Sequence, residues 1–221
     1  MAKAWGLWLI LFLGIGCSEQ LLAQTSIGFR GGFSTNSYSY RVRPASLTTR
    51  TDAGITAPTF ALVAETFLAK NAGAQLEVQL LSLGFTERDT LANTNQTRFD
   101  YIRIPLLSNF YFGNKGRFHI KAGPYIGFLL DVEDVQREWS APDILPTYAQ
   151  PDDRVNAFTY GLAAGAGISG ILGKSTLAAE VRASYEFARP ELQNRIFDQN
   201  AVVIEVTLSY LFRVLKHRPL E

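Results

Sequence analysis

Charged side chains recur at every second position in several stretches of this sequence. In Glu180–Glu186, for example, Glu180, Arg182 and Glu186 alternate with apolar side chains. Successive side chains of a β-strand point to opposite faces, so this spacing gathers the charges on one face. Acidic and basic groups placed in this way are suited to ion pairing with the strands on either side. The same alternation in other segments completes one polar set: Arg30, Glu65, Glu77, Arg103, His119, Lys121, Glu180, Arg182, Glu186 and Glu205.

Histidine is the side chain used most often in acid–base catalysis, and the sequence has two. A hydrolytic triad needs a nucleophile, a histidine and an orienting carboxylate. His217 lies in the basic tail Arg213–Arg218, and His119 shares a strand face with Lys121. We interpret His119 as a hydrogen-bonding group of the polar face, so the sequence predicts no enzyme.

Metal and phosphate sites are equally absent from the pattern. The chain has one cysteine, Cys17, and no histidines at zinc-binding spacing. The acidic residues at 131–134 and 152–153 lack the glycine turn of a calcium loop, and we interpret them as a solvated loop. Gly161, Gly165 and Gly167 alternate within a strand and lead into no helix, which a phosphate loop requires. We therefore expect no cofactor and no metal.

Eight stretches of about 10 to 14 residues position these side chains. Each alternates in polarity and is long enough to cross a membrane as a strand, which takes roughly 9 to 11 residues. They are Ser26–Ser34, Ala57–Ala69, Ala74–Phe85, Phe99–Phe112, Arg117–Leu130, Ala157–Ile171, Thr176–Phe187 and Ala201–Phe212. An even number of strands is typical of single-chain outer-membrane barrels.

The connections between these stretches are alternately long and short. Three are tight-turn sequences rich in glycine and asparagine, which tolerate positive φ: Lys70–Gly73, Gly113–Gly116 and Leu172–Ser175. Four are long and polar: Thr35–Thr56, Thr86–Arg98, Asp131–Asn156 and Ala188–Asn200. An up-and-down barrel with short periplasmic turns and long outer loops produces this alternation.

The apolar face of the strands carries aromatic residues near both ends. At the loop ends lie Phe33, Phe60, Phe128, Phe158, Tyr160, Tyr185 and Phe187, and at the turn ends lie Phe110, Phe112, Phe118, Tyr210 and Phe212. Two aromatic girdles flanking an apolar band are selected by the two interfaces of a bilayer. A basic side chain facing lipid at the midplane would cost about 2 to 4 kcal/mol, so the charged face must line the lumen. The sequence therefore predicts an all-β protein, an eight-stranded antiparallel up-and-down transmembrane β-barrel.

The N-terminus has the features of a secretory signal. Lys3 precedes the apolar run Ala4–Ile15, which is too short to span a membrane as a helix. Two forms of processing stay open, namely cleavage after Ala23 or Gln24 and lipidation of Cys17. We divide the chain into a signal peptide (1–24), an outer-membrane barrel (25–213) and a periplasmic tail (214–221).

The charge balance excludes one class of partner. The chain carries 21 basic and 20 acidic residues, a net charge of +1, whereas a nucleic-acid binder carries a basic excess. We expect outer-membrane lipid as its surroundings and barrel-assembly machinery as a partner during biogenesis. Glu205, Tyr210 and Phe212 fit an assembly signal at the C-terminus, although Thr207 stands where glycine is usual.

Two features disturb the strand pattern. Pro105 and Pro124 each remove a hydrogen-bond donor from the middle of a strand, and we expect a β-bulge or a bend to accommodate them. Leu81-Ser82-Leu83 breaks the alternation of its strand, which indicates a register shift there.

Three motifs resemble a known family. Ile27–Ser34 is similar to the opening strand of the PorT-like outer-membrane β-barrels of Bacteroidota, and Tyr101–Leu107 and Lys121–Gly127 resemble their central strands, prolines included. The resemblance covers essentially the whole mature chain. It implies an outer-membrane location and an eight-stranded barrel, and it implies no ligand.

We therefore expect a non-enzymatic outer-membrane protein with a structural, binding or accessory role through its outer loops, directed at an extracellular or envelope partner. An alternative is a soluble or lipid-anchored barrel that holds an apolar ligand. For the lumen, we expect Arg30 to lie between Glu65 and Glu205, and Arg182 to reach Glu205. Such a network would plug the barrel.

Overall fold

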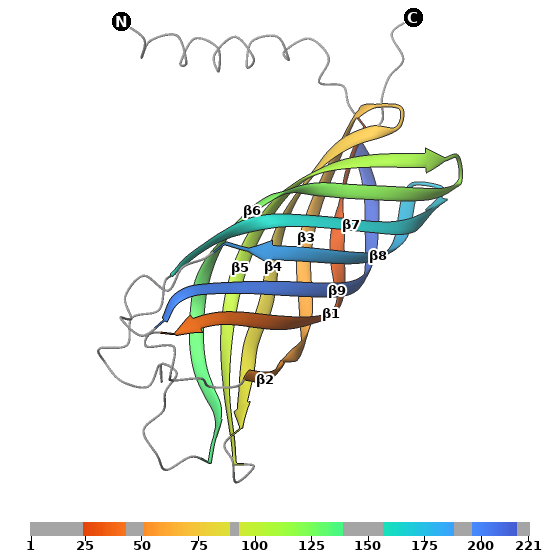
Figure 1. Cartoon of the computed structure of the whole chain (residues 1–221). Helices are drawn as coiled ribbons and strands as arrows, with labels where there is room; N and C mark the ends of the chain where they lie inside the picture. The colour runs from red at the N-terminus through yellow and green to blue at the C-terminus, as the bar shows by residue number, and fades with distance from the viewer. Residues whose placement is uncertain (1–23, 43–50, 89–92, 139–156, 188–195, 216–221) are drawn as a thin grey trace, which may run out of the picture.

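The computed structural model describes residues 24–42, 51–88, 93–138, 157–187 and 196–215. These form nine strands, eight of which make a closed barrel (Figure 1). The strands are β1 (Thr25–Val42), β2 (Thr51–Gly54), β3 (Thr56–Ala69), β4 (Ala72–Arg88), β5 (Thr94–Gly113), β6 (Gly116–Arg137), β7 (Phe158–Leu172), β8 (Ser175–Glu186) and β9 (Ile196–Leu215).

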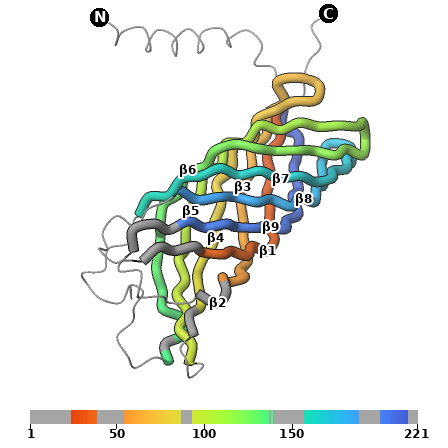
Figure 2. Tube along the Cα trace, viewed as in Figure 1, coloured from red at the N-terminus to blue at the C-terminus, as the bar shows by residue number. Residues whose placement is uncertain are grey.

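Each barrel strand pairs antiparallel with the barrel strands before and after it in the chain, and one further pairing closes the ring. β1 pairs with β9, so the first and last strands meet, and β4 pairs with both β3 and β5. The short strand β2 stands outside the ring order and pairs with the loop end of β4. The trace in Figure 2 shows the strands winding obliquely around one axis. The predicted fold class, an eight-stranded antiparallel barrel, is confirmed.

Tight turns join β3 to β4, β5 to β6 and β7 to β8, all at one end of the barrel, which we call the turn end. Gly113 and Gly173 adopt positive φ values of 109° and 65° there, a conformation that suits glycine because it has no Cβ. Thr25 pairs with Leu215, so the chain enters and leaves the barrel at the same end. The opposite end, which carries the longer connections, is the loop end.

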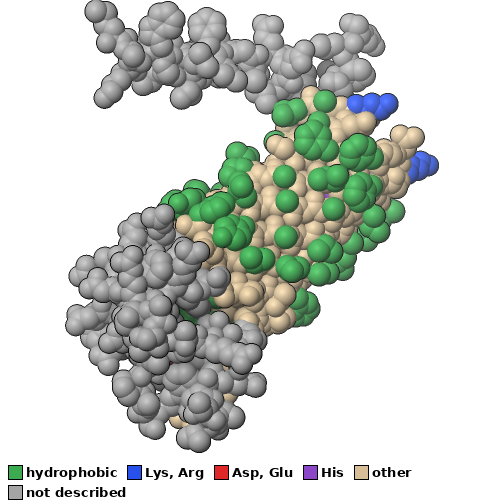
Figure 3. All heavy atoms as spheres, viewed as in Figure 1, with side chains coloured by type: hydrophobic (Ala, Val, Ile, Leu, Met, Phe, Trp, Pro, Cys, Tyr) green, Lys and Arg blue, Asp and Glu red, His purple; other side chains and the backbone are tan. Residues whose placement is uncertain are grey.

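The outer wall of the barrel is apolar. Side chains alternate between buried and exposed along the strands, and the exposed positions are mostly large hydrophobic residues. The twelve aromatic residues assigned to the two girdles are all between 39% and 63% exposed. Figure 3 shows apolar side chains distributed over the visible wall. This surface suits the hydrocarbon core of a membrane. In water, the same alternation would expose the apolar side chains of every strand to solvent.

Five strands extend further toward the loop end than the sequence pattern predicted. β1, β4, β5, β6 and β9 continue through residues that we assigned to the long connections, and β2 lies within one of them. Past the girdle the outward side chains become polar, as at Asp100 and Asp131. The change in polarity made these segments look like loops, although their backbones stay paired.

Pro105 and Pro124 are accommodated without a bulge, which excludes the first of the two accommodations that we expected. Pairing of β4 with β5 skips the residues between Leu76 and Gln79, and the register on either side of the gap is the same. Pairing of β5 with β6 is likewise interrupted between Pro105 and Ser108 without a shift. A missing donor therefore opens the ladder locally, and the neighbouring hydrogen bonds hold the register.

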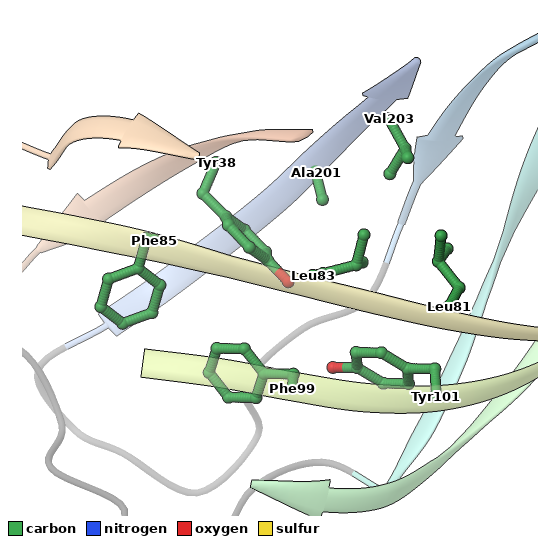
Figure 4. Packing of buried hydrophobic residues seen from close by; sticks show 8 residues of the cluster. All are labelled: Tyr38, Leu81, Leu83, Phe85, Phe99, Tyr101, Ala201 and Val203. Atoms are coloured by element: carbon green, nitrogen blue, oxygen red, sulfur yellow. The ribbon is translucent and has the colours of Figure 1, made fainter. Parts of the chain in front are cut away.

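The predicted register shift at Leu81-Ser82-Leu83 is also wrong. β4 keeps one register with β5 through this stretch, with Ser82 opposite Asp100. Leu81 and Leu83 both point inward, where they join an apolar cluster that fills the loop end of the lumen (Figure 4). Its members are Tyr38, Leu81, Leu83, Phe85, Phe99, Tyr101, Ala201 and Val203. Alternation therefore continues, and it is the polarity of the interior that changes.

Candidate functional site in the charged lumen

The ten residues of the polar set all lie in the barrel interior. Most lie nearer the turn end than the apolar cluster does, whereas Glu186, the last residue of β8, lies opposite Ala201 of that cluster. None of the ten is more than 3% exposed. They come from seven of the eight barrel strands, and the inner face of β7 contributes small residues instead. Charged groups removed from water to this degree are stable only when they are paired and hydrogen-bonded.

Glu77 on β4 is the centre of the network. Arg182 donates two hydrogen bonds to its carboxylate, from Nη1 to Oε2 at 2.9 Å and from Nη2 to Oε1 at 2.8 Å. Arg30 Nη2 donates to Oε2 at 2.8 Å, and Gln75 donates to Oε1. β4 and β8 are four strands apart whichever way round the ring is counted. The two-pronged Arg182–Glu77 pair therefore joins opposite walls and crosses the lumen.

Glu180 on β8 contacts three nitrogen-bearing side chains from β6 and β8. Arg182 Nε donates to Glu180 Oε1 at 2.8 Å, and Lys121 Nζ lies 2.9 Å from Oε2. His119 Nε2 approaches the same oxygen at 3.3 Å. Arg182 thus links Glu180 to Glu77, and the two carboxylates share one guanidinium.

Two further carboxylates are paired with arginine. Glu205 accepts hydrogen bonds from Arg30 Nη1 at 2.8 Å and from Gln79 Nε2 at 2.7 Å. Glu186 accepts one from Arg103 Nη2 at 2.5 Å. The Arg103 guanidinium also lies over the Tyr125 ring, 4.5 Å from its centroid. Delocalised guanidinium groups suit such mixed ionic and aromatic contacts.

Glu65 is held by neutral groups. Its Oε1 accepts hydrogen bonds from Asn109 Nδ2 at 2.6 Å and from the Tyr111 hydroxyl. Within the described part of the chain, no cation forms an ion pair with it. Glu65 is therefore the one carboxylate of the set without a charged partner among the described residues.

The structure corrects both expected pairings. Arg30 contacts Glu205 as expected, but its second partner is Glu77 and not Glu65. Glu65 lies opposite Ser26, four residues along β1 from Arg30, whose two ion pairs are made elsewhere. Arg182 lies opposite Glu205 in the β8–β9 register, but its guanidinium turns across the lumen to Glu77 and Glu180. Long side chains in a narrow interior reach across it, so adjacency in the sheet does not determine partners.

Sequence reasoning missed the neutral members of the network. Gln75 and Gln79 share the inward face of β4 with Glu77, so the alternation that singled out Glu77 could have found them. The glycines of β7 make room for the network. A Cβ at Gly167 would lie 2.7 Å from His119 Nε2, and one at Gly161 would lie 2.6 Å from the Tyr125 hydroxyl.

The arrangement is suited to holding the lumen closed. Glu65, Glu77, Glu180 and Glu205 each accept more than one hydrogen bond, and Arg30 and Arg182 each bridge two carboxylates. Across the described residues, no three His, Cys, Asp or Glu side chains are grouped as a metal site would need. A search of the same residues for a long apolar helix able to cross a membrane found none.

The fold and its interior define a class, the small outer-membrane β-barrel with a buried charged network. The chain matches the family described as "Outer membrane protein beta-barrel domain" over residues 20–188 and belongs to it. The protein therefore resides in the outer membrane.

Solved structures resemble the chain at low sequence identity. OprG from Pseudomonas aeruginosa is 16% identical with a TM-score of 0.51, and the alignment covers 86% of this chain and 93% of OprG. Outer Membrane Protein W from E. coli is 14% identical with a TM-score of 0.45, covering 86% and 97%. Neisserial surface protein A is 9% identical with a TM-score of 0.48, covering 86% and 96%. A search of curated proteins gave no match. At these identities, the likeness to OprG supports the fold alone.

Proposed function

We propose that this protein is a closed, non-conducting and non-enzymatic outer-membrane barrel that acts as a structural, binding or accessory element through its outer loops. The observation that carries the proposal is the Arg182–Glu77 pair, which joins opposite walls across the lumen. An eight-stranded barrel has an interior just wide enough for its own side chains. We therefore expect a bridge across that interior to leave no continuous path for solute.

The apolar cluster supports closure at a second level. Leu83 and Val203 are fully buried, and the rings of Phe85 and Phe99 lie 5.8 Å apart between their centroids. A solute entering from the loop end would meet this cluster before it reached the charged network. Two successive layers, one apolar and one ionic, therefore separate the two ends.

The loop end supports a role in binding. β5 and β6 are 20 and 22 residues long, about twice what the bilayer requires. The register of β6 with β7 ends at Phe128, so β5 and β6 continue past the girdle without β7 beside them. Beyond it, Arg98 and Glu133 form an exposed ion pair at 2.7 Å on the outward face. A wall raised in this way presents loops to whatever lies outside the membrane, which we propose is an extracellular or envelope partner.

The test of closure is conductance. We expect the purified protein to give no steady current in planar bilayers and no swelling of liposomes in small sugars. Insertion is checked separately by flotation and by migration on a denaturing gel, which boiling should change for an intact barrel. Steady currents from inserted protein would exclude the closed lumen, although they would leave the fold intact.

The alternative, a soluble or lipid-anchored barrel with an apolar ligand, would require an apolar interior throughout. The charged network occupies the part of the lumen nearer the turn end and argues against it. The similarity to PorT-like barrels of Bacteroidota, read from Ile27–Ser34, Tyr101–Leu107 and Lys121–Gly127, is part of this proposal. That family name also covers an accessory of a protein-secretion machine, and co-purification of this protein with components of such a machine would test whether it has that role.

A further inference from the structure

The turn end carries charge of one sign. Each of the three tight turns contributes one exposed lysine: Lys70 between β3 and β4, Lys115 between β5 and β6, and Lys174 between β7 and β8. Within the described residues, none of the three lysines contacts a carboxylate. Every carboxylate whose side chain the structure describes lies in the lumen or toward the loop end. Among the residues that the structure describes, the lysines therefore form a basic ring without an acidic neighbour.

Two arginines add to this charge from the inside of the ring. Arg117 and Arg213 lie on the inward face of β6 and β9 close to the turn end, and both are partly exposed. The Arg117 guanidinium stacks over the Tyr111 ring, with 4.3 Å between its Cζ atom and the ring centroid. Basic side chains are visible at the turn end in Figure 3.

The loop end has the opposite character where it is described. Its outward side chains include Asp100, Asp131 and Glu133, with Arg98 as their described basic neighbour. In the sequence, lysine is likewise found at the turn end and not in the connections of the loop end. Downstream of residue 24, lysine occurs in the three turns, in the lumen at position 121 and in the tail at position 216, and in none of the long connections.

The lysines lie at headgroup depth. Lys70 follows Leu68 by two residues, Lys174 follows Leu172 by two, and Leu68 and Leu172 are 71% and 64% exposed on the apolar wall. A strand rises about 3.3 Å per residue and is tilted by about 45° in such barrels, so the Cα atoms of Lys70 and Lys174 lie about 5 Å beyond those of the two wall leucines, measured along the membrane normal. A flexible lysine side chain then carries its ammonium group to the level of the lipid phosphates.

We propose that the ring of Lys70, Lys115 and Lys174 binds the phosphate groups of anionic phospholipids at the turn end of the barrel. The three lysines lie on three turns spaced around the barrel, on the turn-end side of the aromatic girdle. This spacing suits lipid molecules, which surround the barrel wall. A single anionic polymer would instead be met by a contiguous patch on one side. The inference is independent of whether the lumen conducts.

The experiment measures lipid selectivity with spin-labelled lipids. The protein is reconstituted in phosphatidylcholine vesicles, and the motionally restricted fraction is compared for labelled phosphatidylglycerol and labelled phosphatidylcholine. We expect a preference for phosphatidylglycerol of about threefold in low salt, in line with the attraction of a few basic side chains for an anionic surface. The preference should vanish at about 1 M salt, where the screening length is about 3 Å.

Variants decide whether the ring is responsible. The triple variant Lys70→Gln, Lys115→Gln, Lys174→Gln should lose the preference, and the triple replacement by arginine should keep it. Arg98→Gln, at the loop end, should leave it unchanged. Gel migration before and after boiling verifies that each variant is folded. An equal preference in the wild type and the glutamine variant, or none in the wild type, would overturn the proposal and leave the ring available to a non-lipid anion.

Discussion

Arg30 serves two carboxylates from one buried position on β1. Its Nη2 and Nη1 atoms each lie 2.8 Å from an oxygen, of Glu77 and Glu205 respectively. The Arg30→Met replacement keeps much of the volume but removes the charge. Because it leaves two carboxylates short of a cation in the interior, we expect the free energy of unfolding to fall by about 3 to 5 kcal/mol. Urea unfolding in lipid vesicles measures this.

The matched control is Arg98→Met. Arg98 also pairs with an acidic residue, Glu133, at 2.7 Å, but its side chain is 39% exposed and that of Glu133 is 56% exposed. An exposed pair contributes about 1 kcal/mol or less, so this variant should lose little. Equal losses for the two variants would contradict the distinction between lumen and surface.

Glu65 leads to the opposite expectation from its neighbour Glu77. Glu65→Gln removes a buried charge whose described partners are neutral, and the new amide oxygen still accepts from Asn109 and Tyr111. We expect it to be neutral or stabilising. Glu77→Gln leaves Arg30 with Glu205 alone and Arg182 with Glu180 alone, and should cost about 3 kcal/mol or more because Glu77 is the carboxylate that the two arginines share. A larger loss for Glu65→Gln than for Glu77→Gln in the same unfolding assay would show that Glu65 has a cationic partner.

Partner choice was the part of the site that the sequence could not supply. Alternation reports the face on which a side chain lies, because the strand period is two, and this predicts a buried charged network. It does not report how strands stagger around a closed ring. Arg182 pairs with Glu77 on the opposite wall of the barrel, and the sequence pattern of β4 or β8 does not predict a partner four strands away.

At the scale of the element, the small inward residues of β7 leave space for side chains of the neighbouring strands. A Cβ at Gly167 would meet the Ala179 carbonyl oxygen at 2.1 Å and His119 Nε2 at 2.7 Å, whereas one at Gly170 would meet nothing within 4 Å. We expect Gly167→Ala to destabilise the barrel by about 1 to 3 kcal/mol through overpacking. Gly170→Ala, on the same strand, should be neutral or slightly stabilising. The difference between their midpoints of urea unfolding is the measurement, and equal midpoints would refute the packing argument.

The eight membrane strands were predictable at their turn ends and less so at their loop ends. β3 was expected at Ala57–Ala69 and spans Thr56–Ala69, because a glycine- and asparagine-rich turn marks its end. β6 was expected to end at Leu130 and continues to Arg137. Once a strand leaves the bilayer its outer face turns polar, and the contrast that reveals it disappears.

At the scale of the whole molecule, the two ends differ in both charge and shape. The turn end is short and basic, and the loop end is extended and, in its described part, mainly acidic on the outside. The closed ring of strands and the apolar wall suit a membrane, but they do not determine which end of the barrel faces which side of it. The direction of insertion therefore depends on the ends, where short turns belong to the periplasm in barrels of this kind.

Cysteine labelling tests that direction. The sequence has one cysteine, Cys17, which we predict leaves with the signal or is blocked by lipid, so we expect the mature chain to supply no free thiol in either case. Glu133→Cys places a thiol on the outward face of β6 at the loop end, and Lys115→Cys places one in the β5–β6 turn. On intact cells, a membrane-impermeant maleimide should label Glu133→Cys and spare Lys115→Cys. After the cells are lysed both should react, which shows that each thiol is accessible. Labelling of Lys115→Cys alone on intact cells would mean that the barrel is inserted the other way round, with its basic ring outside.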